Sequence, residues 1–137
     1  MIGKFTMAGE TPMSDLGWGS VGMICGPAVT GAKQVAVVEA HFPVRKGHAF
    51  HTHPHQEEVI IVTAGRLEQW IDREKRLLGP GDAAYIPAGV VHASFNVGAV
   101  EARLLAILGP CVGENGVLTV DVADEAPWNA IQTGKAK

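Results

Sequence analysis

The 137-residue sequence has few cysteines, few aromatic residues and no long apolar segment. Cys25 and Cys111 lie far apart without a CxxC partner, so we expect two buried, unreactive thiols rather than a redox pair. Apolar runs such as 59–62 have the length of a strand, which argues against a membrane-spanning segment. The first ten residues lack the apolar run of a signal peptide. We therefore expect a cytoplasmic protein with no membrane partner.

An excess of positive charge is also missing. Lys and Arg number 11 against 14 Asp and Glu, the net charge is -3, and no basic cluster occurs. This composition gives no reason to expect a nucleic-acid partner. No convincing amphipathic helix is present either, whereas 17 glycines and 8 prolines break the chain into short segments. With 47% hydrophobic residues, these segments are apolar enough to pack as an all-β core.

Short apolar segments bounded by turn residues predict roughly nine or ten strands, a pattern typical of a sandwich or closed barrel. The expected strands cover residues 21–25, 34–42, 48–53, 58–63, 67–71, 77–78, 83–86, 92–96 and 102–108, with 117–122 as a further candidate. Residues 72–76 are interpreted as a charged connection.

The length suits a single domain over residues 1–137. We expect residues 1–20 to form an extended arm, 21–122 the barrel and 123–137 a tail. The apolar residues of the arm and the region of Trp128 need a covering surface, which a homodimer would provide.

Histidines supply the main functional signal. Because alternate residues of a strand share a face, His51 and His53 project together, about 6.5–7 Å apart. Imidazoles joined by a carboxylate from the next strand suit Fe, Mn, Ni, Co, Cu or Zn rather than Ca or Mg. Strand alternation does not decide between Glu57 and Glu58, because the residues that follow are apolar on both faces.

Other polar residues have less defined places. Pro54 interrupts the strand before His55, which we expect in a turn near the barrel mouth. Glu39 and His41 face either solvent or the mouth, and His48 is interpreted as a surface or rim residue.

Two ordered motifs resemble those of the cupin family. The first is Gly47-xxx-His51-x-His53-xxxx-Glu58-xxxxxx-Gly65, and the second is Gly81-xxxxx-Pro87-x-Gly89-xx-His92-xxx-Asn96. Residues 66–80 separate them, a short spacing similar to that of small bacterial cupins. The first motif departs from the usual pattern, which has five residues rather than three between its first Gly and first His.

The resemblance implies a cupin-type double-stranded β-helix, or jelly-roll barrel, with one divalent transition metal. Its ligands fall on His51, His53, Glu58 and His92, and the six-residue gap to Gly65 favours Glu58 over Glu57. The structural positions of the family fall on Gly65, Gly81, Pro87, Gly89 and Asn96. Of these, Gly89 is expected at positive φ, and Asn96 is expected to hydrogen-bond backbone near a strand end.

Such a metal keeps open coordination positions, which is typical of a catalytic centre. The resemblance implies a small-molecule enzyme, with a dioxygenase-like oxidoreductase as the most typical form. Decarboxylase, isomerase or lyase chemistry would need an acid or base, for which only Glu39, His41 and His55 are evident. The alternative is a non-catalytic binding or sensor protein. Phe50, Trp70, Tyr85 and Phe95 are candidates for the lining of the lumen, with core packing the favoured interpretation for each. A mostly apolar lumen would suit a small aromatic or diketone-like molecule better than a sugar.

Overall fold

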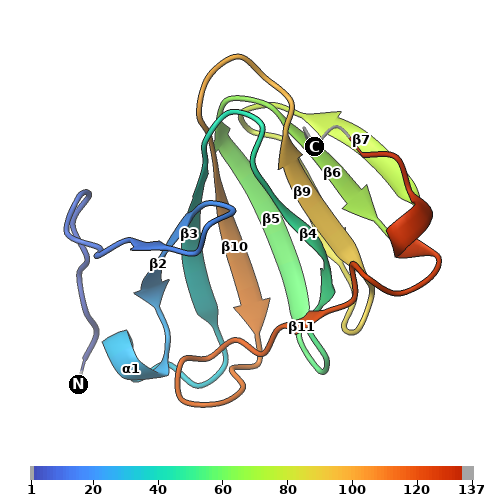
Figure 1. The fold of residues 1–137 in the computed structure, drawn as a ribbon. Coiled ribbons are helices and arrows are strands. Elements are labelled where there is room, and N and C mark those ends of the chain that lie inside the picture. The colour runs from blue at the N-terminus through green and yellow to red at the C-terminus, as the bar shows by residue number, and fades with distance from the viewer. Residues whose placement is uncertain (1, 134–137) are drawn as a thin grey trace.

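Two antiparallel β-sheets face each other in the computed structural model of the chain, which describes residues 2–133 (Figure 1). Sheet A has the strand order β1-β2-β3-β10-β5-β8, and sheet B has the order β11-β4-β9-β6-β7. The strands are β1 (Ser14–Asp15), β2 (Ser20–Cys25), β3 (Ala36–Phe42), β4 (Gly47–Thr52), β5 (Glu57–Ala64), β6 (Leu67–Ile71), β7 (Glu74–Leu78), β8 (Ala83–Ile86), β9 (His92–Asn96), β10 (Ala102–Gly109) and β11 (Val120–Asp121). This double-stranded β-helix confirms the all-β jelly-roll prediction.

Helical structure is brief. Among residues 2–133 it consists of α1 (Pro27–Thr30) and a single 3₁₀ turn (Trp128–Ala130). In the part of the chain that the structure describes, no helix is long and apolar enough to cross a membrane.

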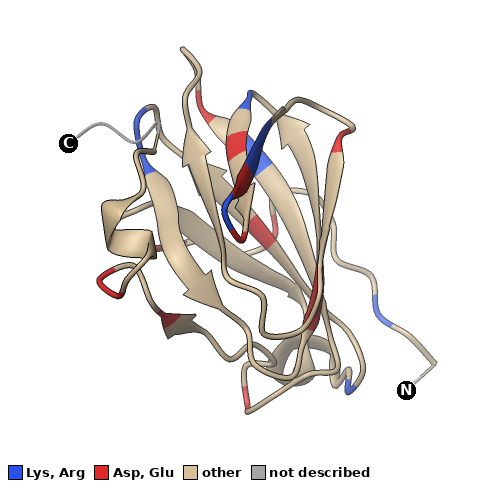
Figure 2. Cartoon of the chain, turned by 90° about the vertical axis from the view of Figure 1, so that its right-hand side faces the viewer, with Lys and Arg blue, Asp and Glu red and all other residues tan. Residues whose placement is uncertain are grey.

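The strand β7 corrects one sequence prediction. Residues 72–76 were expected as a connection, but only Asp72 and Arg73 form the turn, and pairing resumes at Ile71↔Glu74. Asp72 takes a left-handed φ of 54°, which allows the tight reversal. Because β7 is the edge of sheet B, its exposed charged residues stay solvated while their backbone pairs with β6. Figure 2 shows charges of both signs along this edge.

The main core lies between the sheets, where the inward residues of β3, β5, β8 and β10 meet those of sheet B. A second cluster lies on the outer face of sheet B, because Phe50 alternates with the inward His51. It comprises Phe50, Trp70, Ala93 and Phe95, covered by Val122, Trp128 and Ile131 of the C-terminal segment. Phe50, Trp70 and Phe95 therefore pack behind the sheet and not in the lumen, and Tyr85 is 54% exposed.

The two segments expected to need a covering surface differ. Trp128 contacts Phe50 of its own chain, with ring centroids 5.4 Å apart. In the N-terminal arm, Ile2, Phe5 and Met7 are exposed. Of these two segments, the arm is therefore the one whose large apolar side chains a second chain could cover.

Candidate metal centre

Three buried histidines meet inside the barrel where β4 ends and β9 begins, two neighbouring strands of sheet B. His51 lies on β4, His53 follows its end, and His92 begins β9. His51 and His92 are direct partners in the β4–β9 ladder, so the pairing register itself brings their rings together. One ring nitrogen from each histidine lies within 4.8 Å of the others. This is a spacing at which all three could hold one ion.

Glu58 approaches the same point from sheet A. Its Oε1 lies 2.8 Å from His92 Nε2 and 3.4 Å from His53 Nε2, and its side chain is almost fully buried. The neighbouring Glu57 is exposed and accepts a hydrogen bond from the Tyr85 hydroxyl. Strand alternation thus turns one glutamate inward and the other outward, which the apolar residues around them did not reveal.

The outer nitrogen of each ring is held by the backbone. The Nδ1–H groups donate to three carbonyls, from His51 to Ala49 at 2.7 Å, from His53 to Leu118 at 2.9 Å and from His92 to Val90 at 2.9 Å. Because a carbonyl can only accept, each Nδ1 carries the proton and each Nε2 keeps its lone pair. The lone pairs are then free for a metal, the arrangement usual behind metal-bound histidines.

Glu58 and His92 supply a test of whether a cation fits. Their Oε1 and Nε2 atoms are buried and have no hydrogen-bond partner among residues 2–133. In the neutral ring with its proton on Nδ1, Nε2 is an acceptor that faces a carboxylate oxygen, also an acceptor, at 2.8 Å. Two buried acceptors in contact are unfavourable unless a cation, either a proton or a metal ion, lies between them, and three converging imidazoles with a carboxylate are a donor set that fits a metal.

Burial favours the neutral form of His51 and His53, which is the form that binds metals. Desolvation places the pKa of His51 well below its ordinary 6.5, and the neighbouring His48 and His92 lower it further. Desolvation also lowers the pKa of His53, although the carboxylate of Glu58 opposes this by favouring the charged ring.

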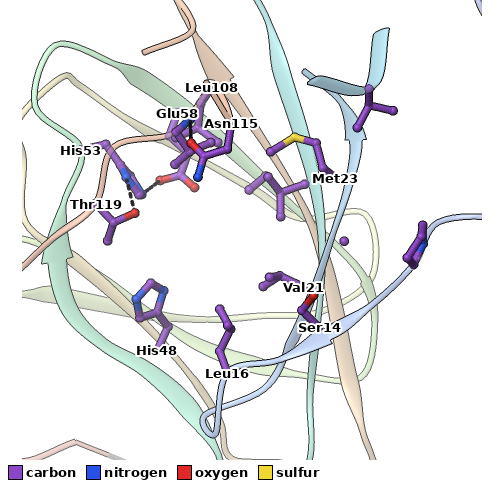
Figure 3. A pocket seen from close by; sticks show the side chains of 16 residues that line it. Ser14, Leu16, Val21, Met23, His48, His53, Glu58, Leu108, Asn115 and Thr119 are labelled. Carbon is purple, nitrogen blue, oxygen red and sulfur yellow. Dashed lines mark hydrogen bonds and ion pairs between the residues drawn. The ribbon is translucent and has the colours of Figure 1, made fainter. Parts of the chain in front are cut away.

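A cavity of about 500 Å³ opens beside this cluster (Figure 3). The side chain of His48 points into it from β4, that of His53 from the turn that follows, and that of Glu58 from β5. The N-terminal arm and the loop before β11 also contribute to its lining. The remaining lining is Pro12, Ser14, Leu16, Val21, Gly22, Met23, Val29, Val38, Ala106, Leu108, Asn115, Val117 and Thr119. Among these described residues there is no Lys, Arg or Asp, so the wall is mainly aliphatic.

His48 belongs to this wall, although the sequence suggested a surface or rim position. Its ring stacks on His51, with centroids 3.6 Å apart, and on Trp18 at 4.2 Å. Burial lowers its pKa from 6.5 to about 3. Strict alternation would put His48 and His51 on opposite faces, but a register shift between them brings both inward. No sequence signal marks that shift.

The other polar candidates lie outside the cavity. Glu39 and His41 form an ion pair at 2.9 Å on the outer face of β3, opposite the inward Val38. His55 is exposed in the β4–β5 turn with a left-handed φ of 67°. The sequence left open whether Glu39 and His41 face solvent or the barrel mouth. Their place on the outer face of β3 favours the first interpretation.

Several structural predictions from the two motifs are confirmed. Gly89 has φ 79°, as expected for the turn before His92. Asn96 donates to the carbonyls of Phe42 and Val100, both at 2.9 Å, and accepts from Gly98 N–H.

Cys25 and Cys111 are free, and both are half-buried rather than fully buried.

The fold and the site together place this chain in a class of small β-barrel proteins. The fold is a double-stranded β-helix, and the possible metal site consists of three histidines and a carboxylate in its lumen. The cupin domain family matches residues 38–108, which is 71 of the 137 residues, so the chain belongs to the cupin family.

Known proteins resemble this chain over parts of their length. Protein SchB of Streptomyces halstedii is 40% identical over 83 residues, 61% of this chain and 57% of that protein. Quercetin 2,3-dioxygenase of Bacillus subtilis (strain 168) is 48% identical over 50 residues, 35% of this chain and 15% of the dioxygenase. The chain spans about half the length of the curated relatives it matches first.

A solved structure supports the fold. The structure of KdgF from Halomonas sp. superposes with a TM-score of 0.73 over 82% of this chain and 97% of that one. The two sequences are 19% identical, so this likeness concerns the fold alone.

Proposed function

We propose that this cupin is a metal-dependent enzyme of dioxygenase type that acts on a small, mostly apolar molecule. One divalent transition metal, among Fe, Mn, Ni, Co, Cu or Zn, is held by His51, His53, Glu58 and His92. The observation that carries the proposal is the buried contact between Glu58 Oε1 and His92 Nε2, two acceptors 2.8 Å apart without hydrogen-bond partners among the described residues. A metal bound there supplies Lewis acidity and, if redox-active, electron transfer.

The chain's own groups prepare the site for that metal. Backbone carbonyls hold the three imidazoles with Nε2 inward, so little reorientation accompanies binding. The aliphatic wall makes the space in front of Glu58 and His53 weakly polar, which strengthens electrostatic interactions with a bound substrate.

The cavity also limits the substrate class. A wall without cationic residues provides no partner for a carboxylate or phosphate on the substrate. Outside the proposed ligands, His48 is the lining residue that combines a half-buried position with a neutral hydrogen-bonding ring. These features favour an uncharged aromatic or diketone-like molecule whose oxygen atoms face the metal, over a sugar or a small dicarboxylate.

The loss of three acid–base candidates favours oxygen chemistry over proton transfer. Glu39, His41 and His55, which decarboxylase, isomerase or lyase activity would use, lie outside the cavity, so that His48 is the described lining residue left to move a proton besides the proposed ligands. The similarity to a quercetin 2,3-dioxygenase over 50 residues supports the same choice. The alternative function is metal-dependent binding or sensing of the same class of molecule without turnover.

Metal analysis combined with oxygen uptake tests the proposal. We expect about one metal ion per chain in the parent protein and in His55→Ala, and at least tenfold less in His92→Ala. With quercetin, catechol or 2,4-pentanedione as probes, oxygen consumption should follow metal content. Saturable binding without oxygen uptake or product would support the sensor alternative. Full metal content in His92→Ala would show that the ligand assignment is wrong.

A homodimer and a cytoplasmic location complete the proposal. The exposed Ile2, Phe5 and Met7 of the arm support pairing with a second chain, which sedimentation at micromolar concentration would detect as twice the chain mass. The cytoplasmic location and the lack of a nucleic-acid partner rest on the sequence alone.

A further inference from the structure

The side chain of Gln56 is 1% exposed, although it lies in the short turn between β4 and β5. Its amide is fully used. Nε2 donates to the carbonyls of Pro110 and Gly116, both at 2.8 Å, and Oε1 accepts from Leu118 N–H at 3.0 Å. One buried side chain thus holds the loop between β10 and β11 at three points.

The same loop supports a proposed metal ligand. The carbonyl of Leu118, whose N–H bonds to Gln56, accepts the Nδ1–H of His53 at 2.9 Å. Asn115, Val117 and Thr119 of this loop also line the cavity. The loop therefore has two attachments to the β4–β5 turn, through Gln56 and through His53, three residues apart.

Both polar atoms of the Leu118 backbone are occupied by these side chains. This explains why residues 117–119 do not join the strand expected over 117–122, whereas Val120 and Asp121 pair with β4 and Val122 N–H donates to Phe50 O at 3.0 Å. The position of the Leu118 carbonyl is then set by Gln56 and not by a strand ladder.

We propose that Gln56 is a positioning residue for the metal centre. By holding the loop, it keeps the Leu118 carbonyl in place, and this carbonyl fixes the tautomer and ring orientation of His53. Loss of such a support behind a metal-bound histidine typically lowers metal affinity about 10- to 100-fold. The role as stated for the metal rests on the proposed function, in which His53 is a ligand.

The chain offers a matched control in Gln69. Its side chain is 3% exposed, and its amide donates to Trp70 O at 3.1 Å and accepts from the Ser94 hydroxyl at 2.6 Å. Gln69 is as buried as Gln56, yet none of its bonds reaches a proposed ligand or the cavity loop. A merely structural role would make the two glutamines equivalent.

Gln56→Leu and Gln69→Leu are compared with the parent in two measurements. Co(II) titration, followed by its visible absorption, should give an affinity about 10- to 100-fold weaker for Gln56→Leu and within about twofold of the parent for Gln69→Leu. In the metal-free proteins, imidazole nitrogen NMR should show His53 as a single Nδ1–H tautomer in the parent and Gln69→Leu, and as a mixture in Gln56→Leu.

The two measurements separate this inference from the proposed function. If the parent binds no Co(II), the proposed metal centre is wrong, and the NMR comparison still tests the link from Gln56 to His53. Equal affinities and an unchanged His53 tautomer in both leucine variants would overturn the inference. Should Gln56→Leu fail to fold, Gln56→Asn and Gln69→Asn, which keep an amide one methylene shorter, provide the same comparison.

Discussion

At the scale of single residues, two adjacent glutamates lie in different environments. Glu58 is buried beside His53 and His92, while Glu57 lies in solvent and bonds Tyr85. Their side chains are identical, so a difference in the effect of the same substitution reports on position alone.

We therefore predict opposite outcomes for Glu58→Gln and Glu57→Gln. Removing the Glu58 charge takes away an anionic oxygen that faces the imidazoles, so metal affinity should fall at least tenfold, as for other groups at a metal site. Glu57→Gln should bind metal within about twofold of the parent, because its exposed charge is screened by water. Isothermal titration with Co(II) measures both. Equal losses, or a loss in Glu57→Gln alone, would contradict the assignment of Glu58.

The sequence predicted the residues of this cluster partly from a local rule and partly from a family resemblance. Alternation along an extended segment puts His51 and His53 on one face, whereas Glu58 and His92 are implied by the resemblance to the two cupin motifs. His48 and Gln56 escaped prediction for physical reasons. A register shift moves His48 inward, and Gln56 bonds partners 54, 60 and 62 residues away.

Turn glycines connect the strands that carry the site, and they differ in what surrounds them. Gly65, in the β5–β6 turn, has φ 71°, and a Cβ there would lie 2.7 Å from Glu101 O and 2.8 Å from Ala102 Cα. Gly89 has φ 79°, but a Cβ there would meet no atom within 4 Å. Gly65 is therefore required both by its backbone conformation and by the lack of space for a Cβ, whereas Gly89 is required by its backbone conformation only.

Gly65→Ala should consequently destabilise the fold more than Gly89→Ala. A left-handed backbone costs a non-glycine residue about 1–2 kcal/mol, which is the whole expected effect at Gly89. At Gly65 the backbone contacts raise the loss to roughly 3 kcal/mol, the range of overpacking added to strain. Urea unfolding gives both free energies. A loss at Gly89 equal to that at Gly65 would mean that steric contact does not decide the difference.

The strands themselves were predictable where apolar patterning and turn residues agree. Leu67–Ile71, Ala83–Ile86 and His92–Asn96 have the bounds expected from sequence. The start of β7 was missed because charged residues on an edge strand look like a loop. Residues 117–119 were taken for strand because their apolar character does not reveal that side chains from the β4–β5 turn occupy their backbone.

At the scale of the whole molecule, the candidate centre joins the two sheets. His51 and His92 belong to sheet B, and Glu58 belongs to sheet A. A metal held at this point, as proposed, would bridge the two sheets beside the cavity. Binding is therefore coupled to the stability of the entire fold rather than to one loop, because the unfolded chain cannot assemble the donors.

Metal removal should lower the melting temperature of the protein. A ligand present at about 1,000 times its Kd stabilises the folded state by about 4 kcal/mol, which for a domain of this size corresponds to roughly 14 °C. Differential scanning calorimetry of metal-loaded and chelator-treated protein measures the shift. His92→Ala should melt at one temperature in both conditions, because it lacks a complete donor set, whereas His55→Ala should behave like the parent. A metal-dependent shift that persists in His92→Ala would place the stabilising ion at another site.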